Sequence, residues 1–155
     1  MQTKQFKWII LVIGLIFCQL IMNSLTIFYV DILGIFLVLI LLNDTYQIRT
    51  LIVLSLLADL IGHWYLGTHL FAAILISFIT GYFVHFYKIC NNYQKNFING
   101  IVYSLLVIII TIIGLITHNS SFSWLSYLIE IFLISPLILW ILQRYIIRFS
   151  ADLVL

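Results

Sequence analysis

The chain has 155 residues, of which 65% are hydrophobic and only 8% are charged, and its mean hydropathy is +1.23. Soluble domains contain roughly 45–50% apolar and about 25% charged residues, so this composition excludes an ordinary soluble domain. The formal net charge of +2 comes from scattered basic residues that form no patch, which argues against nucleic-acid binding. We therefore predict a polytopic membrane protein.

Six apolar segments approach the roughly 20 residues that a membrane-spanning helix needs. In chain order they are Trp8–Leu25, Thr26–Leu42, Thr50–Tyr65, His69–Phe86, Ile98–Thr117 and Phe122–Ile146. The first runs past the length of a signal peptide and lacks a small-residue cleavage site, so we expect it to be retained. No charged loop separates the first two, but one helix of about 35 residues would exceed the hydrocarbon core, so a tight turn is expected between them. The predicted fold class is an all-α bundle of six transmembrane helices, with residues 1–155 as one integral membrane domain.

Basic residues occur only at alternate ends of these segments. They are Lys4, Lys7, Arg49, Lys88, Lys95, Arg144 and Arg148. Cytoplasmic loops of membrane proteins are rich in Lys and Arg, so both termini are predicted to be cytoplasmic. Arg49, Lys88 and Lys95 then form a cytoplasmic rim that would face anionic lipid or a cytoplasmic partner.

Five ionisable residues are expected in the outer half of the bundle: Asp31, Asp59, His63, His69 and Glu130. Charges at mid-membrane cost about 2.5–3.5 kcal/mol, so such residues need partners or a function. One interpretation is structural: Asp59 pairs with His63, four residues later, or with a neighbouring hydroxyl, and fixes helix packing. The other is functional, a polar pocket or partner-docking surface open to the outside. Several of these residues are suitable metal ligands, but they lack a recognised spacing, and no metal site is predicted.

Small residues recur at four-residue spacing along the fourth segment. His69 is followed by Ala73, Ser77, Gly81 and His85. Small side chains let membrane helices approach closely. Two alternatives stay open: Ala73, Ser77 and Gly81 form a seam between helices of this chain, or they bind a helix of another protein.

Motifs that signal catalysis are missing from the sequence. It contains no G-x-S-x-G, H-E-x-x-H, phosphate-binding loop or dinucleotide fingerprint. Ser77 and His85 share a helix face but lie about 12 Å apart along its axis, too far for a nucleophile and its base. We therefore predict neither an enzyme nor a cofactor.

The stretch from Asp59 to His69, D-L-I-G-H-W-Y-L-G-T-H, resembles the signature of the rod shape-determining protein MreD family. Further points of likeness are Asp31 at the start of a segment, Arg49 in a short basic loop, and Pro136 in the last segment followed by Gln143 and Arg144. The sequence departs from the family at Val30, where a Pro is common, and at His63, which is not a family-pattern residue. Asp59, Gly67 and His69 are the recognisable core of the likeness.

The resemblance implies a non-enzymatic scaffold of the bacterial inner membrane that helps to maintain rod shape and side-wall peptidoglycan synthesis. Its implied partner is MreC, a single-span protein with a periplasmic part, and MreB, RodA and a class B penicillin-binding protein act alongside it. Asp31, Asp59, Gly67, His69 and Glu130 are the candidates for binding a partner or ligand. The fold implied is similar to the S-components of energy-coupling-factor transporters, so the alternative function is a membrane subunit that binds a small molecule for uptake.

Overall fold

The computed structural model describes residues 2–24, 30–42, 48–62, 65–118, 129, 134–142 and 144. Within these residues all regular secondary structure is helical. The labelled helices are α1 (Gln2–Ser24), α2 (Ile32–Leu42), α3 (Ile48–Ile61), α4 (Thr68–Ile89) and α5 (Asn92–His118). Residues 135–142 form a further helical segment. The prediction of an all-α chain is therefore confirmed for the described residues.

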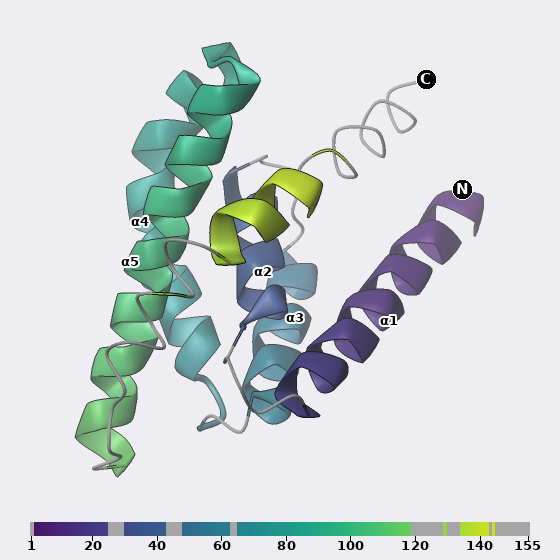
Figure 1. The fold of residues 1–155 in the computed structure, drawn as a ribbon, viewed down its shortest axis with the longest axis vertical. Helices are drawn as coiled ribbons and strands as arrows, with labels where there is room; N and C mark the ends of the chain where they lie inside the picture. Colours follow the sequence, from purple (N-terminus) through teal and green to yellow (C-terminus); the bar gives the residue numbers. More distant parts are fainter. Residues whose placement is uncertain are drawn as a thin grey trace.

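Helix α2 lies in the middle of the molecule and packs against α1, α3, α4 and α5 (Figure 1). All eleven of its residues are buried, in the sequence I-L-G-I-F-L-V-L-I-L-L. A helix that is apolar on every side is stable only when other elements surround it. Phe36, near the middle of α2, is 0% exposed and is among the largest fully buried side chains, together with Ile76 of α4 and Tyr103 of α5. The core of the protein is thus built around α2.

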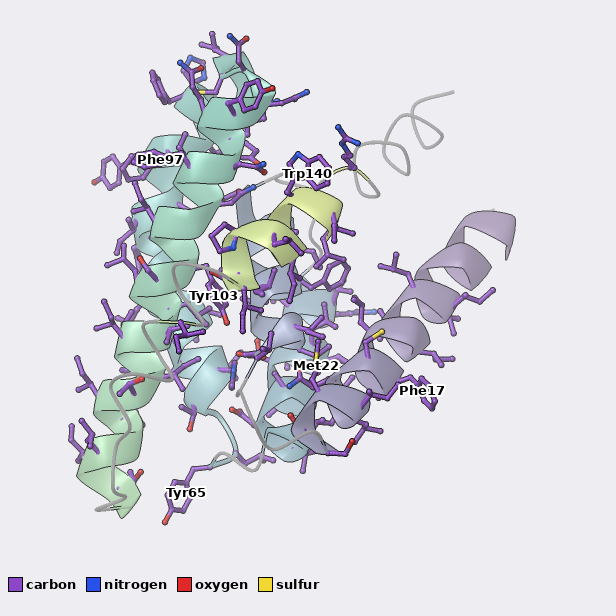
Figure 2. All side chains as sticks on the ribbon, in the orientation of Figure 1. Phe17, Met22, Tyr65, Phe97, Tyr103 and Trp140 are labelled. Atoms are coloured by element: carbon purple, nitrogen blue, oxygen red, sulfur yellow. The ribbon has the colours of Figure 1, made fainter. Side chains whose placement is uncertain are left out.

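Large apolar side chains are exposed over much of the outside of the molecule. Phe17, Phe78 and Ile116 are 65%, 71% and 79% exposed, and many other large apolar side chains are exposed on α1, α3, α4 and α5. Figure 2 shows Phe17 and Phe97 pointing away from the helices, whereas Tyr103 points inward. Soluble monomers rarely expose large contiguous apolar patches. This surface needs lipid or another protein against it.

Two helices are long and apolar enough to cross a membrane among the residues described: Thr68–Ile89 in α4 and Asn92–Thr117 in α5. The apolar stretches Ile9–Ser24 in α1 and Ile32–Leu42 in α2 are shorter. These helices are evidence of membrane association. The expected six spans are not established by them, and the last expected span lies largely outside the described residues.

The second expected span begins later than the sequence indicated. We expected a helix over Thr26–Leu42, but Val30 and Asp31 are not helical and α2 starts at Ile32. Asp31 accepts a hydrogen bond from the backbone N–H of Gly34, which is the geometry of a residue that caps a helix N-terminus. Hydropathy alone could not show this start, because residues on both sides of Asp31 are apolar.

Successive helices run in alternating directions, so the N-terminal end of α1 and the junction between α4 and α5 lie at the same end of the molecule (Figure 1). Lys4 and Lys7 are in the first turns of α1, while Lys88 and Lys95 flank the α4–α5 junction. We call this the basic end. Asp59, near the end of α3, and His69, near the start of α4, belong to the opposite end. The alternation of charge predicted from the sequence therefore agrees with the helix directions.

Candidate functional site

His69 lies between two carboxylates. Its ring Nδ1 is 2.7 Å from Asp59 Oδ1, and its ring Nε2 is 2.7 Å from Asp31 Oδ2. The exposed fractions are 0% for His69, 0% for Asp59 and 4% for Asp31. We call Asp31, His69 and Asp59 the carboxylate–histidine cluster. It joins the start of α2 and the end of α3 to the start of α4.

Asp59 also holds the first turn of α4. Its Oδ2 accepts a hydrogen bond from Gly67 N at 2.6 Å, and its Oδ1 accepts one from His69 N at 2.9 Å. The first N–H groups of a helix have no partner within the helix and carry partial positive charge, so a carboxylate there is favourable. Gly67 has a φ of 99°, in the left-handed region that glycine adopts without strain. The turn after α3 can therefore fold back until His69 reaches Asp59.

Asp31 performs the corresponding role for α2. Its Oδ1 accepts a hydrogen bond from Gly34 N at 2.8 Å, which leaves Oδ2 for His69. The carboxylate lies so close to Gly34 that a Cβ there would be 2.7 Å from Asp31 Cγ and nearer still to Oδ2. Glycine at position 34 therefore gives the Asp31 side chain the space to fold over the first turn of α2.

Two amides of α1 extend this polar network. Gln19 accepts a hydrogen bond from Ile32 N at 2.6 Å and donates one to Val30 O at 2.7 Å. Asn23 accepts a bond from Gln19 and donates one to Ile61 O, at the end of α3. Each amide thus satisfies backbone groups where a helix starts or ends. Irregular backbone among apolar helices is stable only when its polar groups are paired in this way.

The polar groups of the cluster are directed at one another and at the backbone. The two carboxylates lie on opposite sides of the imidazole ring, because they contact different ring nitrogens. In the described part of the chain no group of three His, Cys, Asp or Glu side chains is arranged to hold a metal ion. The cluster is therefore suited to joining helices and to holding protons.

The structure brings together four of the residues singled out in the sequence: Asp31, Asp59, Gly67 and His69. In the described structure Asp59 pairs with His69, ten residues away. His63 and Glu130 lie outside the described residues. Asp59 therefore pairs within the chain, with His69, while the expected pairing with His63 falls on a residue outside the described part.

The expected small-residue seam of α4 is only partly found. Ala73 is buried, Ser77 is half-buried and donates to Ile74 O of its own helix, and Gly81 is exposed. A Cβ on Gly81 would meet nothing within 4 Å, so Gly81 makes no close helix–helix contact with the described residues. Steps of four residues drift around a helix of 3.6 residues per turn. The buried face instead mixes steps of three and four, through His69, Ala72, Ala73, Ile76 and Thr80.

The expected basic rim is exposed at the basic end. Arg49 and Lys88 are exposed, and Lys95 is half-buried with its Nζ 5.5 Å from the centre of the Tyr87 ring. Arg144 lies over the ring of Trp140, at 4.1 Å from its centre. Basic side chains beside aromatic rings are typical of a membrane–water interface.

Gln19, Asn23 and Gly34 were not singled out in the sequence. Gln19 and Asn23 are polar residues four apart in an apolar segment, so they share one helix face. Gly34 follows Asp31 at the spacing that a capping carboxylate needs to reach the third residue of a helix. Both patterns were visible signals, but neither indicates which other helix is contacted.

Comparisons with known proteins do not assign this site. No protein-family model, curated protein or solved structure matches the chain. The function proposed next rests on the residues and contacts described above and on the resemblance of the Asp59–His69 stretch.

Proposed function

We propose that the chain is a non-enzymatic scaffold of the bacterial cell-elongation machinery. In this role it crosses the inner membrane six times with both termini in the cytoplasm. The chain binds an MreC-like protein that has one membrane span. Through this partner it supports rod shape and side-wall peptidoglycan synthesis. MreB, RodA and a class B penicillin-binding protein are the further partners of this assembly. The Asp59–His69 stretch, which resembles MreD, supplies the family part of the proposal.

One observation carries the choice of a scaffold. The residues of the carboxylate–histidine cluster are hydrogen-bonded to one another and to helix ends, while large apolar side chains are exposed on the outside. A binding pocket for a polar molecule would need polar groups that point into free space. A scaffold needs a rigid bundle and an exposed surface on which a membrane helix can pack. The arrangement of Asp31, Asp59 and His69 favours the second.

The exposed face of α4 is the part of this surface that we assign to the partner helix. It carries Gly81 with open space above it, and the neighbouring Phe78 and Tyr82 are 71% and 88% exposed. A small residue between large ones gives a helix surface a notch into which another helix fits closely. The basic rim at Lys88 lies at the end of the same helix, where an anionic lipid surface or MreB would contact it.

The test is a co-purification from a rod-shaped bacterium that expresses the tagged chain. The protein is extracted in mild detergent, and the bound proteins are identified by mass spectrometry. Gly81→Leu should reduce recovery of the single-span partner several-fold, because the new side chain fills the notch. Gly14→Leu on α1 is the matched control, since Gly14 is also exposed with nothing within 4 Å of a Cβ. It should leave recovery unchanged.

Depletion of the protein supplies the cellular readout, in which rod-shaped cells should become round. Unchanged cell shape, together with no single-span partner among the bound proteins, would reject the scaffold. A retained vitamin-sized molecule and an associated ATPase module would favour the uptake subunit instead. Equal partner recovery for Gly81→Leu and Gly14→Leu would keep the scaffold but remove the α4 face from the interface.

A further inference from the structure

The two contacts of His69 need one more proton than two ionised carboxylates and a neutral imidazole carry together. An ionised carboxylate only accepts hydrogen bonds, and a neutral imidazole carries one N–H. Both ring nitrogens of His69 nevertheless lie 2.7 Å from a carboxylate oxygen. With a neutral ring between two ionised carboxylates, one of these contacts would place two lone pairs against each other. One further proton makes both contacts favourable.

The geometry indicates where this proton lies. Both oxygens of Asp59 accept backbone N–H groups, from Gly67 and His69, and Oδ1 also faces His69 Nδ1. Both oxygens of Asp59 therefore act as acceptors, and Nδ1 of His69 supplies the hydrogen of their contact. The remaining contact joins His69 Nε2 to Asp31 Oδ2. The additional proton lies in that contact, on the nitrogen or on the oxygen.

We propose that Asp31 and His69 form a proton-binding site whose bound proton holds the start of α2 against α4. With the proton bound, the cluster of Asp31, His69 and Asp59 carries a net charge of −1. When the proton leaves for water, the charge becomes −2, and the lone pairs of Nε2 and Oδ2 repel each other across a buried contact. This site does not depend on the scaffold role proposed above.

Two carboxylates are the charged groups that the described structure places against His69. Asp31 comes from the start of α2 and Asp59 from α3. From α1 the network receives only the neutral amides of Gln19 and Asn23. Within α5, the described Lys95 is in the first turns, at the basic end.

Asp31→Asn tests the site because an asparagine amide imitates a protonated carboxyl. Its oxygen can accept the hydrogen bond from Gly34 N, while its NH₂ donates to His69 Nε2 without a bound proton. In the pH range where the folded wild type holds this proton and the unfolded chain has lost it, the wild-type folding equilibrium constant should fall up to tenfold per pH unit as the pH rises, the slope for one proton; the fall should end where the folded protein loses the proton. Asp31→Asn should lack this part of the pH dependence when both proteins are unfolded in the same detergent.

Asp59→Asn is the contrasting variant. An amide NH₂ there would face either Gly67 N–H or the N–H groups of His69, so it should be destabilised at every pH. Equal pH dependence in the wild type and Asp31→Asn would overturn the proposal.

Nuclear magnetic resonance of the wild type gives an independent decision if a variant fails to fold. The protein is labelled with ¹⁵N in histidine rings and with ¹³C in aspartate carboxyls, and signals that disappear in His69→Gln and in Asp31→Asn assign the two groups. At near-neutral pH we expect an imidazolium at His69 or a protonated carboxyl at Asp31. A neutral His69 ring beside two ionised carboxylates would overturn the proposal.

Discussion

The carboxylate of Asp31 lies directly against the α-carbon of Gly34. A Cβ at position 34 would come within 2.7 Å of Asp31 Cγ, which is far inside van der Waals contact, and it would overlap Oδ2 more closely. The same Oδ2 contacts His69. The small size of one residue in α2 therefore decides whether α2 can be joined to α4.

Gly34→Ala should weaken the protein although alanine is the better helix former. The new methyl group displaces the Asp31 carboxylate, and breaking a buried charge pair costs about 3 kcal/mol or more, against about 1 kcal/mol gained in helix propensity. We expect a net loss of about 2 kcal/mol in the free energy of unfolding, measured in detergent micelles. Gly81→Ala is the control, because it has open space and should gain up to about 1 kcal/mol. Similar effects of the two changes would contradict the placement of Asp31.

Gly67→Ala should strain the turn that leads into α4. The φ of 99° at Gly67 is unfavourable for any residue with a Cβ, and we expect a loss of about 1–2 kcal/mol. Asparagine tolerates this backbone region better, so Gly67→Asn should lose less. Gly100→Ala, in α5, also meets open space but has no such φ, and it should not destabilise the protein. If unfolding curves give Gly67→Ala and Gly100→Ala the same free energy of unfolding, alanine at position 67 does not strain the turn.

Gln19→Leu should destabilise the junction between α1 and α2. The change leaves Ile32 N and Val30 O without the side chain that now bonds them, and each unsatisfied buried group costs about 1–3 kcal/mol. Gln94→Leu makes the same chemical change where the amide accepts one exposed backbone N–H, from Asn91. Its effect should stay below about 1 kcal/mol. Hydrogen exchange should also show faster opening at Ile32 in Gln19→Leu only, and unchanged exchange there would argue against the Gln19 bridge.

Phe36→Ala and Phe78→Ala should separate the core from the surface. Phe36 is 0% exposed on α2, so its truncation leaves a cavity and should cost about 3–5 kcal/mol. Phe78 is 71% exposed on α4, and its truncation should change the free energy of unfolding by no more than about 0.5 kcal/mol. Thermal melting of both variants in the same detergent makes the comparison. A large loss for Phe78→Ala and a small one for Phe36→Ala would mean that α2 is not the centre of the fold.

Several features could be predicted because they depend on local composition. Long apolar stretches predicted the helices, and the placement of Lys and Arg at alternate ends predicted the alternating directions. Asp31, Asp59, Gly67 and His69 stood out because polar residues and a turn glycine are conspicuous in an apolar sequence. These properties need only the identity of each residue and its neighbours along the chain.

Residue identities alone thus specify a helical chain that is apolar on most faces and is interrupted by a few polar residues that need partners. The identity of those partners depends on how the helices pack against one another. His69 reaches Asp31 across 38 positions of the chain and Asp59 across ten, while Gly81, from the expected seam, faces outward. The reason is geometric: each residue turns about 100° around its helix, so its contacts depend on how separate helices and the Gly67 turn are placed in space.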